Sequence, residues 1–116
     1  MARDILHDNV MVLKFEQAII EFLEAYAKGY QNSPDGLDTQ VIVDNRGRHY
    51  QLLRVGWPNK KFIHFCVFHF DIKDDKIWVQ VNETEELIVD ELARRGISPE
   101  DVELGFQPEY LRKVVA

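Results

Sequence analysis

Apolar residues recur every three or four positions in the first quarter of the chain. Between Asn9 and Lys28 they occupy Val12, Phe15, Ile19, Phe22, Leu23 and Tyr26, with charged residues between them. This spacing is typical of an amphipathic helix and predicts one over residues 9–28. The following segment, YQNSPDGLD (30–38), collects turn-forming residues without an apolar period, so it predicts a loop.

The middle of the chain changes to the alternation typical of strands. Four segments show it: TQVIVD (39–44), RHYQLLRV (48–55), FIHFCVFHFDI (62–72) and KIWVQVN (76–82). The outer pairs are joined by Asn45-Arg46 and Asp74-Asp75, connections so short that they favour an antiparallel meander over parallel crossovers.

Helical signals return after the fourth strand. In NETEELIVDELARRG (82–96), Asn82 is a candidate N-cap and Gly96 a stop, and SPED (98–101) and QPEYLRK (107–113) predict two further short helical segments. The predicted fold class is therefore α+β: an N-terminal helix, a four-stranded antiparallel meander sheet and then C-terminal helices, in a single domain of residues 1–116.

Alternation also assigns side chains to the two faces of the predicted sheet. With Asp74-Asp75 as a two-residue turn, one face is apolar through Phe68, Phe70 and Ile72, takes the first helix, and includes His64 and Cys66. The residues assigned to the other face are His49, Leu53, Val55, Trp57, Ile63, Phe65, Val67, His69, Asp71, Trp78, Gln80 and Asn82. So many apolar residues indicate that something covers this second face, either the C-terminal helices, a second protein chain or a small molecule.

The net charge of the chain limits the kinds of partner that it is expected to bind. The formal net charge is -6, with acidic residues concentrated in 82–103, which disfavours non-specific binding to phosphate backbones or anionic lipid. The acidic segment is either a solvated helix face or a docking surface for a basic partner. Cys66 is the only cysteine, and we find neither a signal-peptide pattern nor an apolar span of membrane length, so we expect a cytoplasmic protein with no membrane partner.

The histidines, the cysteine and Asp71 raise the question of a reactive site. His64 and Cys66 stand two apart on one strand, about 6–7 Å from each other, which does not bring a nucleophile and a base into contact. His69 and Asp71 share a face, but zinc needs three or four ligands and only His49 offers an obvious third. We therefore expect a hydrogen-bonded pair that orders the sheet, with no catalytic residue, metal or cofactor.

Four long motifs in fixed order resemble one protein family. They are YQLLRVGW (50–57), CVFHFDIKDDKIWVQ (66–80), NETEELIVDEL (82–92) and GISPEDVELGFQP (96–108), followed by Arg112. Together they resemble the XisI family, the fdxN-element excision controlling factors of cyanobacteria. The resemblance implies an α+β regulatory protein that acts beside a nuclease-like partner, XisH, in a DNA rearrangement during heterocyst differentiation, more as a binding protein than as an enzyme.

The resemblance also assigns roles to residues. A candidate interface or ligand face comprises Trp57, His69, Asp71, Lys76, Trp78 and Gln80. Structural motif positions comprise Tyr50, Gly56, Thr84, Glu85, Gly96, Pro99, Asp101, Gly105, Phe106, Pro108 and Arg112. Two alternatives stay open: a small-molecule-binding protein or enzyme that uses the His69/Asp71/Trp78/Gln80 face, and direct DNA binding through Lys60 and Lys61. A homo-oligomer is also compatible with the sequence.

Overall fold

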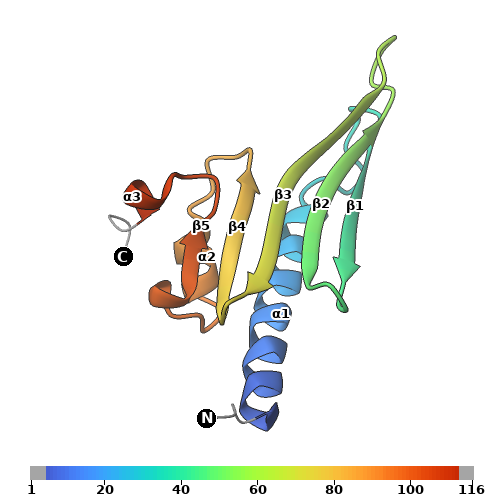
Figure 1. Cartoon of the computed structure of the whole chain (residues 1–116). Coiled ribbons are helices and arrows are strands. Elements are labelled where there is room, and N and C mark those ends of the chain that lie inside the picture. Colours follow the sequence, from blue (N-terminus) through green and yellow to red (C-terminus); the bar gives the residue numbers. More distant parts are fainter. Residues whose placement is uncertain (1–4, 113–116) are drawn as a thin grey trace.

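The computed structural model describes residues 5–112 of the chain (Figure 1). Its elements are α1 (Ile5–Lys28), β1 (Leu37–Asp44), β2 (His49–Gly56), β3 (Ile63–Lys73), β4 (Lys76–Asn82), α2 (Ile88–Ala93), a 3-10 turn η1 (Pro99–Asp101), β5 (Val102–Leu104) and α3 (Glu109–Arg112). The α+β class, the first helix and the four predicted strands are confirmed.

The sheet has five strands in the order β1-β2-β3-β4-β5, and the last pair is parallel. The prediction of a four-stranded antiparallel sheet is wrong in this respect. β5 follows β4 through α2, and this crossover returns the chain alongside β4 in the same direction. Its three residues, with Glu103 in the middle, are too few to show an alternating pattern in the sequence.

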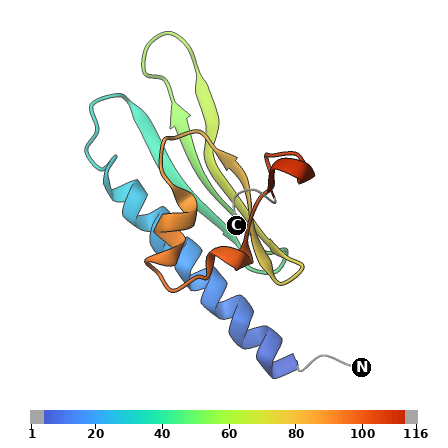
Figure 2. The same ribbon diagram turned by 90° about the vertical axis from the view of Figure 1, so that its left-hand side faces the viewer.

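One cluster of buried residues joins the sheet to both longer helices. α1 contributes Phe15, Ile19, Phe22 and Leu23, which pack on Phe68, Phe70 and their neighbours in the sheet, and α2 contributes Ile88 and Leu92. α1 and α2 therefore lie on one side of the sheet, whereas the short α3 lies on the other (Figure 2). The largest C-terminal helix does not cover the second sheet face, contrary to one of our expectations. We call the face opposite α1 and α2 the open face.

The C-terminal helical segments are shorter than their sequence patterns suggest. α2 begins at Ile88 rather than near Asn82, because the Asn82 side chain closes a turn instead of capping a helix. Asn82 Oδ1 accepts hydrogen bonds from the backbone N–H of Thr84 at 3.0 Å and from its hydroxyl at 2.6 Å. Among residues 5–112, no helix combines the length and apolar character needed to cross a lipid bilayer.

Two β-bulges alter the predicted assignment of faces. Leu52 of β2 pairs with Phe68 of β3 and Leu53 with Cys66, so Val67 is the extra residue on β3 and is buried together with Phe68. The prediction that Val67 lies on the second face, opposite Asn82, is wrong, because Phe68 pairs with Asn82. In β3 residues 63–66, which precede this bulge, each side chain therefore lies on the face opposite to the one predicted. Cys66 and His64 therefore pair with open-face residues of β2, and the prediction that they lie in the core is wrong.

The same inversion moves two other residues away from the open face. Phe65 pairs with Arg54 and Ile63 with Gly56, so both take the helix side of the sheet rather than the predicted second face. On β4, Phe70 pairs with Val79 but His69 with Val81, which makes Gln80 a second extra residue. The predicted pairs Phe68 with Val81 and His69 with Gln80 are therefore shifted by one residue.

The two tight connections differ in length. Lys73 pairs with Lys76, and Asp74 and Asp75 both have positive φ angles of 53° and 61°, as the predicted two-residue hairpin turn requires. The turn between β1 and β2 spans residues 45–48 instead, because Asp44 pairs with His49. Asp44 Oδ1 accepts the backbone N–H groups of residues 46 and 47, which closes this longer turn.

A buried arginine fastens the loop between α1 and β1 to the sheet. The Arg54 side chain donates three hydrogen bonds to the Asp35 carboxylate at 3.0–3.1 Å. Its guanidinium also lies 3.8 Å from the centre of the Tyr30 ring. The Leu37 backbone N–H and then Arg54 lower the pKa of Asp35, so this loop end stays charged and paired at neutral pH.

Candidate functional site

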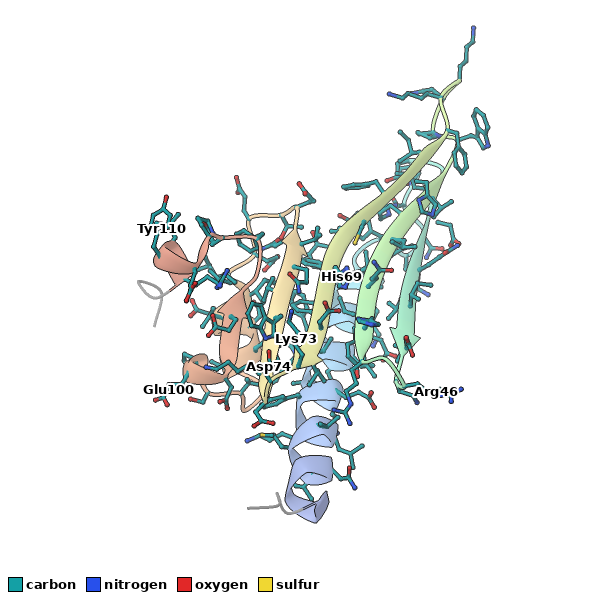
Figure 3. The ribbon with its side chains drawn as sticks, in the orientation of Figure 1. Arg46, His69, Lys73, Asp74, Glu100 and Tyr110 are labelled. Atoms are coloured by element: carbon teal, nitrogen blue, oxygen red, sulfur yellow. The ribbon has the colours of Figure 1, made fainter. Side chains whose placement is uncertain are left out.

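Two histidines and an aspartate converge near the middle of the open face. His49 is the first residue of β2 and lies directly opposite Asp71 of β3, two residues from His69 on the same strand. His49 Nδ1 lies 2.6 Å and His69 Nε2 lies 2.8 Å from Asp71 Oδ1. Figure 3 shows His69 in the middle of the sheet, above Lys73 and Asp74 at the end of the strand. We call His49, His69 and Asp71 the His/Asp cluster.

The electrostatics of the cluster keep the carboxylate ionised. Partial burial would raise the pKa of Asp71, but hydrogen bonds from His49, His69 and Gln80 outweigh burial and lower it below its ordinary value. The bond to Asp71 in turn raises the pKa of His49. The cluster therefore favours an anionic Asp71 beside a readily protonated His49.

Two glutamines contact two further polar atoms of the cluster, His69 Nδ1 and Asp71 Oδ2. Gln51 Nε2 lies 3.2 Å from His69 Nδ1, and Gln80 Nε2 donates to Asp71 Oδ2 at 3.1 Å. Gln80 can reach Asp71 because the β4 bulge leaves it without a strand partner on β3. Orientation of each cluster side chain is therefore set by neighbours on three strands.

Two glycines leave the space that these side chains occupy. A Cβ at Gly47 would lie 2.8 Å from the His49 ring, and a Cβ at Gly105 would lie 2.3 Å from Gln80 Oε1. A side chain at either position would displace its neighbour. Gly105 is one of the predicted motif positions, and its contact with Gln80 gives that prediction a physical reason.

Trp78 is adjacent to the cluster but contacts a different set of residues. It pairs with Asp71 across the strands, while Lys73 Nζ lies 4.4 Å and the Arg112 guanidinium 5.3 Å from the centre of its ring. An open hollow of about 230 Å³ is lined by Trp78, Glu103, Glu109 and Arg112. His69, Asp71, Trp78 and Gln80, predicted to form one site, therefore share one face of the sheet. The Trp78 ring, however, lines this hollow rather than the His/Asp cluster.

Lys76 lies at the edge of the same region. Its Nζ donates to the backbone carbonyl of Glu100 at 2.8 Å and lies 3.5 Å from Glu103 Oε1. Arg112 Nε lies 3.6 Å from the other oxygen of Glu103. Lys76 and Arg112 thus fasten the C-terminal segment to the sheet beside Trp78.

Trp57 lies apart from the other predicted interface residues. It follows β2 in the projecting β2–β3 hairpin, 62% exposed, with its ring 5.2 Å from that of Phe62. Lys60 and Lys61 are exposed in the same turn. The structure therefore separates the predicted face into the His/Asp cluster with its neighbours and an aromatic, basic hairpin tip.

A larger hollow lies on the opposite side of the sheet from the cluster. It measures about 570 Å³ and opens between the C-terminal end of α1 and β1, with Lys28, Tyr30, Thr39 and Val41 in its lining. Its lining includes none of the residues singled out from the sequence. This hollow, although larger than the one beside Trp78, is therefore not part of the site predicted from the sequence.

The motif residues of the second strand have structural roles. The Tyr50 hydroxyl donates to Glu16 Oε2 of α1 at 2.6 Å, and burial together with this bond raises the pKa of Tyr50. Gly56 has a φ angle of +150°, and a Cβ there would lie 2.6 Å from the carbonyl oxygen of Gly36. These two positions hold the sheet against the helix and the preceding loop.

The motif residues around α2 shape its two ends. The Thr84 hydroxyl accepts the backbone N–H of Glu86 at 3.0 Å, whereas Glu85 is exposed. Gly96, with a φ angle of +89°, follows α2 and ends it, as its position predicts.

The remaining motif residues build the C-terminal segment. Pro99 opens η1 and Asp101 closes it, with the Asp101 N–H donated to the carbonyl of Ser98. Phe106 is half exposed beside Leu104 and α2, and the Pro108 carbonyl accepts the backbone N–H groups of Leu111 and Arg112 in α3. These positions direct the chain from β5 past Trp78.

Sequence reasoning did not include His49 and Gln51 among the candidate site residues. The register of β2 against β3 is what places them in the site, because it pairs His49 with Asp71 and Gln51 with His69. His49 was recognised as a possible third ligand, but its register depended on the length of the β1–β2 turn.

Comparison with known proteins agrees with this fold. The sequence model of the XisI protein family matches residues 10–116. A crystal structure of a XisI-like protein from Anabaena variabilis ATCC 29413 has 38% sequence identity and a TM-score of 0.81, covering 89% of this chain and 94% of that one. A crystal structure of the fdxN element excision controlling factor XisI from the same organism has 27% identity and a TM-score of 0.77, covering 91% and 99%. No curated protein sequence matches. The chain belongs to the XisI family.

Proposed function

We propose that this protein is an accessory factor that controls excision of a DNA element by binding a nuclease-like partner of the XisH type. The support for the excision role is the relative named fdxN element excision controlling factor XisI, which this chain resembles over 99% of that protein's length. The partner is inferred from the family resemblance of the sequence motifs. The binding surface is inferred from the geometry of the sheet.

The observation that carries the surface is the open face itself. Within residues 5–112, α1 and α2 both pack on the other side, and only the segment ending in α3 approaches the open face, beside Trp78 (Figure 2). Across β1–β3 the face presents Ile42, which is 41% exposed, next to the half-buried Gln51 and Leu53. An uncovered sheet face that mixes apolar and polar groups is the composition of a non-obligate protein interface.

The charge of the chain favours a basic partner. Exposed carboxylates follow the sheet at Glu83, Glu85 and Glu86 and recur at Asp90 and Glu100. A protein that acts on DNA presents a basic surface, and complementary charge accelerates association and selects the partner. This chain would then restrain or position its partner by occupying part of that surface.

The reactive groups of the face favour binding over nucleophilic chemistry. Burial raises the pKa of the Cys66 thiol, and its Sγ–H donates to the Phe68 carbonyl at 3.0 Å, so the thiolate needed for attack is disfavoured. Asp71 accepts three side-chain hydrogen bonds and is held as an anion rather than as a proton donor.

Co-expression with an XisH-type partner tests the proposal directly. The tagged partner should retain the wild-type chain on affinity resin, and Ile42→Glu should abolish retention because it places a charge in the exposed apolar part of the open face, on the edge strand β1. Leu13→Glu is the matched control, since Leu13 is a 62% exposed apolar residue of α1 on the other side of the sheet. Its variant should be retained like the wild type.

Each outcome has a defined meaning. If the partner does not retain the wild-type chain, the proposed function is wrong. If Leu13→Glu and Ile42→Glu lose binding equally while both remain folded by circular dichroism, the open face is not the binding surface.

A further inference from the structure

We propose that His49, His69 and Asp71 bind a divalent ion of the late first transition series, of which zinc is the type, with three protein ligands and a remaining position open to solvent. This inference goes beyond the proposed function and does not depend on it. It concerns the isolated chain, whereas the proposed function concerns a partner protein.

The donor atoms already converge. One ligand atom from each residue lies within 4.8 Å of the other two, and Asp71 Oδ1 lies 2.6 and 2.8 Å from the two imidazole nitrogens. Zinc bonds of about 2.0–2.2 Å in tetrahedral geometry place ligand atoms roughly 3.3–3.5 Å apart. To admit the ion, the carboxylate oxygen and the two ring nitrogens must therefore move apart by less than about 1 Å. The half-exposed His49 side chain can make such a movement.

Two of the atoms that would not bind the metal, His69 Nδ1 and Asp71 Oδ2, also have hydrogen-bond partners. Metal-binding imidazoles usually donate their other N–H to an acceptor, and metal-binding carboxylates are themselves hydrogen-bonded. The Gln51 amide lies beside His69 Nδ1. Because the oxygen and nitrogen ends of an amide have nearly the same shape, a 180° rotation of this group would place Oε1 there as an acceptor for the His69 N–H. Gln80 holds Asp71 Oδ2 and so leaves Oδ1 for the ion.

Protons and the metal compete for the same two nitrogens. In the hydrogen-bonded arrangement, His49 Nδ1 and His69 Nε2 each carry a proton directed at Asp71. On metal binding each neutral ring keeps one proton on its other nitrogen, which for His49 faces solvent and for His69 faces Gln51.

The donor set defines the class of ion. Two imidazole nitrogens and one carboxylate oxygen suit zinc and neighbouring transition metals, whereas magnesium and calcium prefer oxygen alone. Three protein ligands on two strands, with His49 54% exposed at the surface, give the ion a path from solvent and a free coordination position.

Calorimetric titration of tag-free protein with Zn²⁺ at neutral pH tests the site, with Co²⁺ absorption as a report on coordination. The wild type should bind one Zn²⁺ per chain. His49→Ala and Asp71→Asn should each weaken binding at least tenfold, because even changes to residues behind the ligands cost about 10–100-fold in affinity. His64→Ala is the matched control, an exposed histidine of β3 beyond the Val67 bulge, and should bind as the wild type does.

Proton–nitrogen NMR of the histidine rings separates this site from other zinc binding. Zn²⁺ should shift His49 and His69 together and leave His64 unchanged. The proposal is overturned if the wild type binds no Zn²⁺, or if folded His49→Ala and Asp71→Asn proteins bind it as tightly as the wild type. Neither result would bear on the proposed binding of a partner protein, which the co-expression experiment tests separately.

Discussion

Replacing Gly105 with alanine should disturb the His/Asp cluster without touching any of its three members. The added Cβ would lie 2.3 Å from Gln80 Oε1 and 3.3 Å from Trp78 Cε3. Both distances are shorter than ordinary contacts, and the end of the flexible Gln80 side chain is the part that can move. Gln80 must therefore swing away and give up its 3.1 Å hydrogen bond to Asp71.

The magnitude follows from these contacts. A hydrogen bond to a charged group contributes roughly 1.5–3 kcal/mol, and partial access of water to Asp71 lowers the net loss to about 1 kcal/mol. Crowding against Trp78 adds up to about 1 kcal/mol. We expect Gly105→Ala to reduce the free energy of unfolding by about 1–2 kcal/mol in urea denaturation followed by tryptophan fluorescence.

A double-mutant cycle isolates the cause. Gln80→Ala alone should lose the same hydrogen bond, but in that background the alanine at position 105 no longer meets the Gln80 side chain and keeps only its contact with Trp78. The two changes together should therefore cost about 1 kcal/mol less than the sum of the single changes. Additive effects, within about 0.3–0.5 kcal/mol, would refute the proposed contact between residues 80 and 105.

Three further outcomes are expected. His49 should titrate by NMR with a pKa above 6.5 that falls towards 6.5 in Asp71→Asn; the protonated pair then stabilises the fold below about pH 6.5, and its contribution is lost as the pH rises through the raised pKa. An unchanged titration in the variant would contradict the pairing. Tyr50→Phe should destabilise the protein by about 1–2 kcal/mol in urea denaturation, because its buried hydroxyl bonds to Glu16; no loss would mean that this bond contributes nothing. The isolated chain, with a net charge of -6, should show no duplex DNA binding at low salt, and binding that falls steeply with salt would instead indicate direct contact with DNA.

The sequence predicts the elements well because their signals are local. The turn at Asp74 and Asp75 fixes the β3–β4 register next to it, and pairs such as Ile72 with Ile77 follow correctly. The three-residue β5 was missed because its pairing with β4 depends on the path of the chain through α2 and not on its own pattern.

Faces are harder to predict than strands because a bulge leaves no mark in an apolar run. Val67 and Phe68 both suit a core, and nothing in their identity shows that the strand gains a residue there. Every face assignment on the far side of that position, including His64 and Cys66, was consequently reversed. His69 and Asp71 lie between the bulge and the turn, so their shared face was predicted correctly.

The bulge at Val67 also sets the faces of the β3 residues that follow the projecting hairpin. The alternation of β3 is reset at this residue, so the faces of His64 and Phe65 do not continue the alternation that places His69 and Asp71. Deleting Val67 would place Cys66 directly before Phe68, so one uninterrupted alternation would keep His64 and Cys66 on the open face while the strand lost the local bend of the bulge.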